Sequence, residues 1–441
     1  MSHERSVSAP EHELSPETVW HIQMPEIRFG LNATEELPFQ IRDIGVEAGA
    51  HGLVVTDETL VDLGHADRVV SELTEAGFEA DVYDESEREP SVSAIDDAVE
   101  FVRDQQGESG YDFYVGLGGG SCIDTAKATR VVVENGGNPL EYIAEPTGDG
   151  KPIEDAGPPL VLMPTTAGTG AEISPVAILS VEEKEIKEAI SSNHVRADAA
   201  VLDPTFTTTL PPEMSAKTAM DALGHAIEGY TTHPFDSLLR ASDPGSRPVY
   251  AGRTPLTEMF SEKAIDLLSN NVRQVVNNGD DLEARSKMLQ GALFGAIAGL
   301  TAGATLCHAM AYPVGNRYHT YHGETIATLT PASTIDYNSA SDPARFARVA
   351  ELFGVDTTGL TDREAADALK EQYIQLQKDL NVLPSGLNEL AGITEDDVDW
   401  LAEQTVETQA RLLRCNPRPV TKEDVHEIFV DALYNWDPDE P

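Results

Sequence analysis

The amino-acid sequence predicts an α/β domain with a parallel sheet, followed by an all-α domain. Between about residues 30 and 205, short β-rich runs alternate with helix-like segments, which is the rhythm of a parallel, doubly wound sheet. From about residue 211 the strand pattern fades and long helical periodicities follow. The length of 441 residues also favours two domains.

The predicted elements follow the chain in a regular order. The β-rich runs cover residues 52–56, 80–83, 112–115 and 160–163, and helical periodicity between them covers residues 66–76 and 92–105. Later helices are expected at 214–230, 255–271, 281–303, 343–352 and 363–378. Turn-forming residues at 203–212 (DPTFTTTLPP) mark the domain boundary. We therefore expect a flexible lead at 1–20, the α/β domain at 21–208 and the helical domain at 209–441.

The charge and composition exclude several classes of protein. The 76 acidic residues against 30 basic ones give a formal net charge of −46, which would repel nucleic acid and anionic membranes. Such an acidic surface is typical of adaptation to a salt-rich cytoplasm. The three cysteines form no disulfide framework, so a reducing cytoplasm is expected. The apolar stretch 292–310 is interrupted by glycines, which favours a small-residue core helix over a membrane span.

A glycine-rich segment follows the third β-rich run. The segment YVGLGGGSCIDTAK (114–127) is a predicted strand, a loop and a predicted helix, with candidate loop glycines at Gly118, Gly119 and Gly120. Glycines let backbone N–H groups approach an anion, and a helix N-terminus adds its positive dipole end. Ser121 and Asp124 are spaced as a capping box. The segment predicts a pyrophosphate site, with a ligand-free tight turn as the alternative.

Two further features support a nucleotide site. Asp57 ends the first β-rich run, where an acid can accept hydrogen bonds from a ribose 2′-hydroxyl and repel a 2′-phosphate, which favours NAD over NADP. The alternative for Asp57 is a simple helix cap. PTTAGTG (164–170) is a second Gly/Thr-rich loop after a strand, able to offer hydroxyl and amide donors.

Four residues of the second half have the composition of a metal site. Asp221 and His225 are four apart on one predicted helix and so share a face. His308 and His322 flank a predicted turn, AYPVGNRYHTYHG. One carboxylate and three imidazoles suit a divalent transition metal, so Fe²⁺ or Zn²⁺ is expected. His319 competes with His322 as the ligand from this turn, and we favour His322.

Other histidines have no such neighbours. His51, His65 and His194 are expected to be structural. A nicotinamide beside a metal indicates hydride transfer to and from an alcohol carbon, with the metal as Lewis acid.

These motifs, in this order, resemble those of the iron-containing alcohol dehydrogenases. GGGSCIDTAK, PTTAGTGAE, DALGHAIEGY and the segment 308–322 carry the resemblance, which runs from about residue 27 to residue 419. It implies a dinucleotide-binding α/β domain, an all-helical domain, a metal in the cleft and frequent self-association into homo-oligomers. It also implies Asp221, His225, His308 and His322 as metal ligands. The candidate NAD-site residues are Asp57, Gly118, Gly119, Gly120, Ser121, Asp124, Thr165, Thr166 and Lys187.

Within that family, the sequence is similar to the hydroxyacid-oxoacid transhydrogenase branch. RPVYAGRTPLTEMF (247–260), LEARSKM (282–288), CHAMAYP (307–313) and NPRP (416–419) carry this likeness, and Tyr312 stands where many family members have His. The spacing of 14 positions from His308 to His322 is shorter than in that branch. The branch implies hydride transfer from a hydroxyacid such as 4-hydroxybutyrate to an oxoacid such as 2-oxoglutarate through bound NAD, with Tyr312 near the metal-centred catalytic site.

A substrate carboxylate would need a cationic partner. Arg247, Arg317 and Arg418 are candidates, and pairing with one of the many acids is the alternative for each. Three other functions compete: a simple NAD(P)-dependent alcohol dehydrogenase that releases NADH, a sugar-phosphate cyclase or glycerol-phosphate dehydrogenase, and a non-enzymatic metal-binding protein. The expected partners are therefore small alcohols, hydroxyacids or oxoacids.

Overall fold

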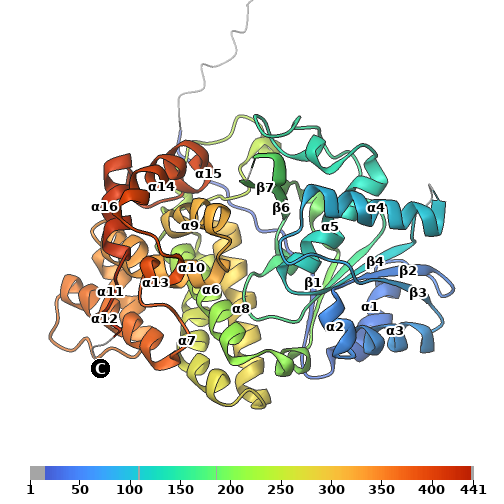
Figure 1. Ribbon diagram of the computed structural model, residues 1–441, viewed down its shortest axis with the longest axis horizontal. Helices are drawn as coiled ribbons and strands as arrows, with labels where there is room; N and C mark the ends of the chain where they lie inside the picture. Colours follow the sequence, from blue (N-terminus) through green and yellow to red (C-terminus); the bar gives the residue numbers. More distant parts are fainter. Residues whose placement is uncertain (1–14, 108–109, 185, 439–441) are drawn as a thin grey trace, which may run out of the picture.

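The N-terminal half is built on one parallel sheet. The computed structural model describes residues 15–107, 110–184 and 186–438 (Figure 1). Six strands lie in the order β1-β8-β5-β4-β2-β3, and every pair is parallel. Their bounds are β1 Glu26–Phe29, β2 His51–Val55, β3 Glu79–Tyr83, β4 Phe113–Gly118, β5 Leu160–Pro164 and β8 Ala199–Leu202. The predicted fold class is confirmed.

The helices of this half connect the strands. They are α1 Leu37–Asp43, α2 Glu58–Asp62, α3 His65–Glu75, α4 Val92–Gln106 and α5 Gly120–Asn135. A two-stranded antiparallel pair, β6 Val176–Val181 and β7 Ile186–Ser191, stands apart from the main sheet. The chain runs from β2 to β3 on one side of it, and then crosses back to place β4 on the other side of β2. The strand order therefore reverses between β2 and β4. Ligands bind at such switch points, beyond the carboxyl ends of the strands.

The C-terminal half consists of helices (Figure 1). They are α6 Pro212–Thr231, α7 Pro255–Asn277, α8 Leu282–Ala302, α9 Leu306–Tyr318, α10 His322–Thr330, α11 Pro343–Leu352, α12 Asp362–Leu380, α13 Leu387–Ala391, α14 Glu395–Thr408, α15 Ala410–Leu413 and α16 Lys422–Ala432. Proline opens α6, α7 and α11, where its missing N–H would have no partner anyway. All strands of the described residues end by Leu202, close to the predicted boundary at 203–212.

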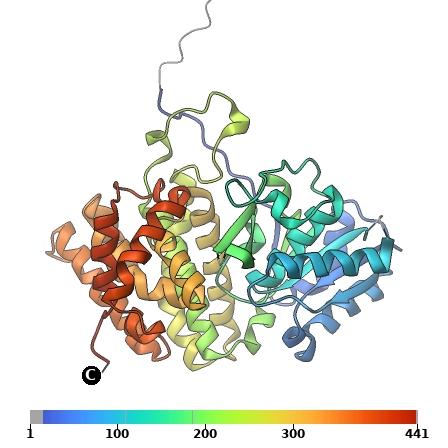
Figure 2. The ribbon, with the colours of Figure 1, turned by 45° about the horizontal axis from the view of Figure 1, so that its top comes forward.

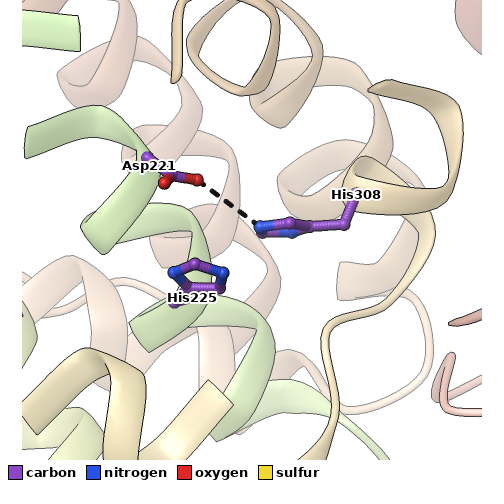
Figure 3. A group of neighbouring side chains, drawn as sticks. All are labelled: Asp221, His225 and His308. Atoms are coloured by element: carbon purple, nitrogen blue, oxygen red, sulfur yellow. Dashed lines mark ion pairs between the residues drawn. The ribbon is translucent and has the colours of Figure 1, made fainter. Parts of the chain in front are cut away.

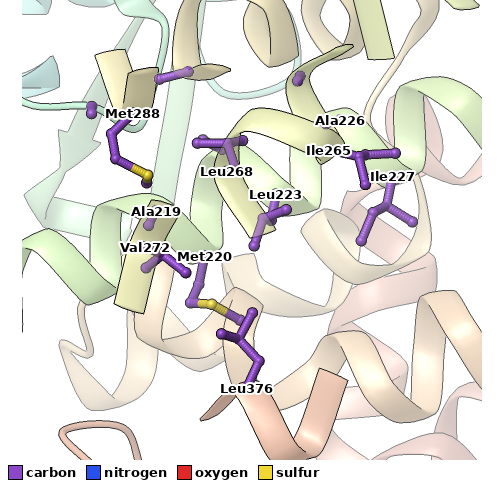
Figure 4. Close-up of a cluster of buried hydrophobic side chains, with 14 of the residues drawn as sticks. Ala219, Met220, Leu223, Ala226, Ile227, Ile265, Leu268, Val272, Met288 and Leu376 are labelled. Atoms are coloured by element: carbon purple, nitrogen blue, oxygen red, sulfur yellow. The ribbon is translucent and has the colours of Figure 1, made fainter. Parts of the chain in front are cut away.

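Helices α6, α7 and α8 form the core of this half. Met220, Leu223, Leu268 and Met288 are among the fully or almost fully buried side chains between them (Figure 4). The glycines of α8 permit this close packing: a Cβ on Gly299 would lie 2.7 Å from the carbonyl oxygen of His225. The small residues up to Ala302 lie where α8 packs on α6, as expected for a core helix. The expected single helix over 292–310 does not form, because the chain breaks at residues 303–305 and continues in α9. No single described helix is long and apolar enough to cross a membrane, although α8 and α9, bent by 99°, pass that test as a pair.

The start of the described chain lies beside a long connection of the helical half (Figure 2). Residues 1–14 of the expected lead are outside the described residues. Within residues 15–20, Pro16 bridges Leu239, and the buried carboxylate of Glu17 accepts a 3.0 Å hydrogen bond from Nε of Arg247. This ion pair ties the N-terminal segment to the connection between α6 and α7.

Candidate metal and nucleotide site

Four side chains from three helices meet at one point. Helix α6 carries Asp221 and His225 one turn apart, His308 lies in the first turn of α9, and His322 is the first residue of α10 (Figure 3 shows the first three). Oδ1 of Asp221 lies 3.7 Å from Nε2 of His308 and 3.5 Å from Nε2 of His322. The rings of His225 and His308 stack at 4.5 Å, and those of His308 and His322 are 5.4 Å apart. The structure therefore brings together all four predicted ligands.

The cluster contains buried polar atoms without partners. Oδ1 of Asp221, Nδ1 of His225 and Nε2 of His308 are buried and make no hydrogen bond. Potential ligand atoms of these three residues lie within 4.8 Å of one another. Because an unpaired buried polar group is unfavourable, such convergent atoms indicate a missing common partner. The donor set, one carboxylate and three imidazoles, fits a divalent transition metal.

The protonation states of the cluster support a ligand role. Burial lowers the pKa of His225 to about 4. Desolvation lowers the pKa of His322 in the same direction, although 42% of its side chain is exposed. Neutral imidazoles are the form that binds a metal. Burial also acts on Asp221, but the neighbouring histidines outweigh it and lower the pKa of this carboxyl. For His308, burial is outweighed by the Glu228 and Asp221 carboxylates, which raise its pKa to about 9. The imidazoles of His225 and His322 can therefore bind a cation without first losing a proton.

Glu228 is a site residue that the sequence analysis missed. Its fully buried carboxylate lies 2.5 Å from Nδ1 of His308. It also accepts hydrogen bonds from the backbone N–H of Thr305 at 2.9 Å and of Cys307 at 2.8 Å. The carboxylate thus caps the start of α9 and orients the His308 ring so that Nε2 faces Asp221. The signal was present in the sequence, because Glu228 lies seven residues after Asp221 and three after His225, on the same helix face.

The glycine loop joins β4 to α5 as predicted, although Gly118 ends β4, Gly120 starts α5 and only Gly119 lies between them. Its expected capping box does not form. Helix α5 starts at Gly120, so Ser121 is its second residue, and its hydroxyl donates instead to the carbonyl of Arg88. Asp124 points inward, where it accepts a 3.1 Å hydrogen bond from the N–H of Ile178. Gly119 is the N-cap, and no side chain caps the helix, which leaves N–H groups of its first turn for a ligand.

One cavity of about 360 Å³ joins the glycine loop to the histidine cluster. Its lining includes Gly119, Gly120, Ser121, Asp124, Thr166, Lys187, Tyr312 and all four predicted metal ligands. Nζ of Lys187 pairs with the Glu89 carboxylate at 2.7 Å. His319 is 79% exposed and lies outside this lining, whereas His322 belongs to it. A volume of this size suits a small ligand.

Three predicted nucleotide residues are not on the lining of this cavity: Asp57, Gly118 and Thr165. Asp57 caps α2, since its Oδ1 accepts a 2.9 Å hydrogen bond from the N–H of Leu60, and its Oδ2 lies 3.3 Å from Sγ of Cys122. The helix-cap alternative for Asp57 is thus realised, and its contact with a ribose stays a prediction. Gly118 has a φ of 149°, which favours glycine at the end of β4.

The three candidate carboxylate anchors have other partners and do not line the cavity. Arg247 pairs with Glu17 and Arg317 with Asp397, while the guanidinium of Arg418 stacks on the Tyr337 ring. These candidates were therefore wrong. The alternative, pairing with acids, holds for the first two. Basic residues that do line the cavity are Arg88, Lys187 and Lys217.

The fold and the site together define a class of protein. It is an oxidoreductase with a nucleotide-binding sheet and, between its helices, a cluster of potential metal ligands. The chain belongs to the iron-containing alcohol dehydrogenase family, as the sequence resemblance predicted. A family model described as iron-containing alcohol dehydrogenase matches residues 25–204. A second, described as the C-terminal part of the Fe-containing alcohol dehydrogenase family, matches residues 249–433. The protein is therefore an enzyme.

Relatives of known activity cover nearly the whole chain. The mitochondrial hydroxyacid-oxoacid transhydrogenase of Xenopus tropicalis is 30% identical over 440 residues, covering 96% of this chain and 93% of its own. The long-chain-alcohol dehydrogenase 1 of Geobacillus thermodenitrificans is 32% identical over 409 residues, covering 93% and 95%.

Solved structures have the same fold. A 1,3-propanediol oxidoreductase superposes with a TM-score of 0.83 at 29% identity, and an alcohol dehydrogenase from Oenococcus oeni with 0.81 at 28%. Both matches cover 94% of this chain and 100% of the other chain. Similarity to a transhydrogenase and to alcohol dehydrogenases agrees with metal-dependent oxidoreduction of an alcohol or hydroxyacid.

Proposed function

We propose that this enzyme transfers a hydride between the carbinol carbon of a small hydroxyacid or alcohol and NAD. The observation that carries the proposal is the convergence of unpartnered atoms of Asp221, His225 and His308 on the wall of the cavity that also contains the glycine loop. These residues and His322 would hold the metal, with Fe²⁺ favoured by the family and Zn²⁺ as the alternative. When bound, the metal supplies Lewis-acid polarisation of the substrate oxygen.

The residues of the chain itself position the two reactants. The free N–H groups at the start of α5 and the glycines before it would bind the pyrophosphate. Thr166 and Lys187 line the same cavity. Apolar residues on the wall, including Leu300 and Ala304, exclude water from the reacting carbon.

We favour a transhydrogenase that keeps its NAD bound, because a relative of that activity matches almost the full chain. The alternative is a dehydrogenase that releases NADH. The test mixes the iron-loaded enzyme with 4-hydroxybutyrate and 2-oxoglutarate, with and without added NAD, and follows both products. Product formed without added NAD is the expected result. NADH that accumulates only with added NAD, and without an oxoacid, would support the dehydrogenase.

The preference for NAD is assigned to Asp57. Replacing Asp57 with Ser should raise the ratio of kcat/KM for NADP over NAD about tenfold, because a like charge would no longer oppose the 2′-phosphate. Serine can still cap α2, so the helix is retained. The matched control is Asp62→Ser, which removes an exposed acid from the end of the same helix. An unchanged ratio for the Asp57 variant would show that this carboxylate does not face the ribose.

We also infer that the enzyme works in a salt-rich cytoplasm, because the net charge of −46 opposes the compact state through self-repulsion at low salt. The melting temperature should therefore rise as KCl increases from about 0.1 M to about 3 M, where the screening length is only a few ångströms. Differential scanning fluorimetry at constant pH measures this. A melting temperature that is flat or falls over that range would contradict the inference.

A further inference from the structure

The cavity has a second polar cluster, formed by Tyr250, Tyr312 and Arg411. Both tyrosines line the cavity, and Arg411 lies behind them. Nη1 of Arg411 donates to the hydroxyl oxygen of Tyr250 at 3.4 Å, and its guanidinium carbon is 5.2 Å from the centre of that ring. Burial raises the pKa of the Tyr312 hydroxyl to about 12, and the charge of Arg411 opposes that rise. This cluster contains no predicted metal or nucleotide residue.

The cluster lies on the helical side of the metal site. Tyr312 follows His308 by one turn of α9, and its ring is centred 6.2 Å from the ring of His322. The cavity wall contributed by the same half of the chain includes the apolar side chains of Leu300, Ala304 and Leu412. If the carbinol carbon of a short alkyl chain lies at the histidine cluster, the rest of the chain would contact apolar side chains and then the hydroxyl groups of Tyr250 and Tyr312.

Arg411 forms no ion pair within the described part of the chain. No carboxylate among those residues lies within 4.0 Å of its guanidinium, although the chain has 76 acids. The acid that acts on it is Glu188, whose Oε1 accepts a 3.2 Å hydrogen bond from Thr147. A half-buried cation without an ion pair favours an anionic ligand nearby.

The two lysines of the cavity wall form ion pairs, and Arg88, which forms none among the described residues, lies beside the glycine loop. Lys187 pairs with Glu89, and Lys217 pairs with Glu324 at 3.0 Å and with Glu213. Arg88 lies on the nucleotide side: its guanidinium stacks on Tyr321 and its carbonyl accepts from the glycine-loop serine. These contacts leave Arg411 as the better placed cation for a substrate group beyond the metal.

We propose that Tyr250, held by Arg411, and Tyr312 bind the distal carboxylate of a hydroxyacid or oxoacid substrate. Because Arg411 donates to the tyrosine oxygen, the tyrosine keeps its own hydrogen to donate to a carboxylate oxygen. The positive charge behind the hydroxyls strengthens these hydrogen bonds. The tyrosines contact the substrate, and Arg411 is a positioning residue. This proposal rests on the proposed function and narrows its substrates to molecules that carry an anionic group a few carbons from the reacting carbon.

The test compares two substrates of equal chain length, 4-hydroxybutyrate and 1-butanol, with the iron-loaded enzyme. The wild type should have the higher kcat/KM for 4-hydroxybutyrate. Arg411→Gln and Tyr312→Phe should each reduce the ratio of kcat/KM, acid over alcohol, about tenfold, mainly through a higher KM for the acid. Arg411→Lys should restore part of the ratio. The matched control, Arg414→Gln, alters an exposed arginine of the same segment and should leave the ratio unchanged.

A binding measurement supplies a second readout. Titration calorimetry with butyrate, which has the carboxylate but no reacting hydroxyl, should show weaker binding to the Arg411→Gln and Tyr312→Phe variants than to the wild type. The proposal would be overturned if the variants lost kcat/KM equally for 4-hydroxybutyrate and 1-butanol, or if the wild type did not prefer 4-hydroxybutyrate. Either result would leave the proposed function intact. Loss of the preference in Arg88→Gln but not in Arg411→Gln would also overturn it. A wild type that oxidises neither compound would count against both the proposed function and the proposal.

Discussion

Replacing Asp221 with Asn is expected to abolish stoichiometric metal binding and to lower kcat/KM at least about 10³-fold. The amide has the shape of the carboxylate but not its charge, and the metal contributes several kcal/mol to transition-state stabilisation. Asp221 is the common neighbour of the cluster, since its Oδ1 faces both His308 and His322. Metal content by mass spectrometry after loading with Fe²⁺ and desalting measures the first effect, and steady-state kinetics the second.

A thermal measurement separates loss of the metal from loss of the fold. Fe²⁺ should raise the melting temperature of the wild type, because a ligand that binds only the folded state stabilises it. The Asp221→Asn variant should melt cooperatively without that shift. The exposed Asp280 provides a control, and Asp280→Asn should keep both the metal and the shift. One metal per chain retained by Asp221→Asn would refute the assignment of this ligand.

Replacing Glu228 with Gln is expected to weaken metal binding 10- to 100-fold, the usual consequence of losing a carboxylate behind a ligating histidine. The neutral amide keeps the size of the side chain but no longer makes the His308 imidazole more basic. The amide must also accept the hydrogen bonds from the N–H groups of Thr305 and Cys307, which the carboxylate accepts in the wild type. Competition with a chelator of known affinity gives the dissociation constant.

The control for Glu228→Gln is Glu283→Gln, at an 80% exposed position on α8. This variant should bind the metal as the wild type does. Activity alone does not test Glu228→Gln, since the residue also caps α9. A variant that is less stable but has an unchanged dissociation constant for the metal would show that Glu228 supports the fold and not the metal site.

The sequence analysis identified the metal cluster because its signal is local. Asp221 and His225 are four residues apart on a helix, so the spacing alone puts them on one face. Glu228 has the same helical spacing but was not predicted, because in a chain with 76 acids a glutamate on a helix is most simply explained as a surface residue. The Tyr250–Arg411 contact joins residues 161 positions apart, which only the fold brings together.

Prediction of the sheet succeeded where strands are rich in β-branched or aromatic residues, as in β2 and β4. It missed β1 and β8, which have only four residues each, and β8 begins with two alanines. Small residues lack the β-branched pattern that marks a strand. The β6–β7 pair was also missed. Tertiary pairing, and not local propensity, therefore defines β8, whereas β6 (Val176–Val181) has the composition of a strand.

The predicted turn between His308 and His322 was wrong. Helix α9 runs through Pro313 to Tyr318, and only residues 319–321 separate it from α10. Proline normally disrupts a helix interior, but Met310 and Val314 on either side of it are fully buried in an apolar cluster. Packing thus overrides the local preference, and this short connection places His322 opposite Asp221.

The most direct test of hydride transfer at this site follows deuterium. The iron-loaded enzyme is incubated with NAD and with 4-hydroxybutyrate or 1-butanol deuterated at the hydroxyl-bearing carbon, and the nicotinamide is analysed by mass spectrometry and NMR. The account predicts one deuterium at C4 of the reduced nicotinamide, and none in the Asp221→Asn variant. Substrate oxidation with the deuterium released to water, or label transfer that persists in that variant, would contradict it.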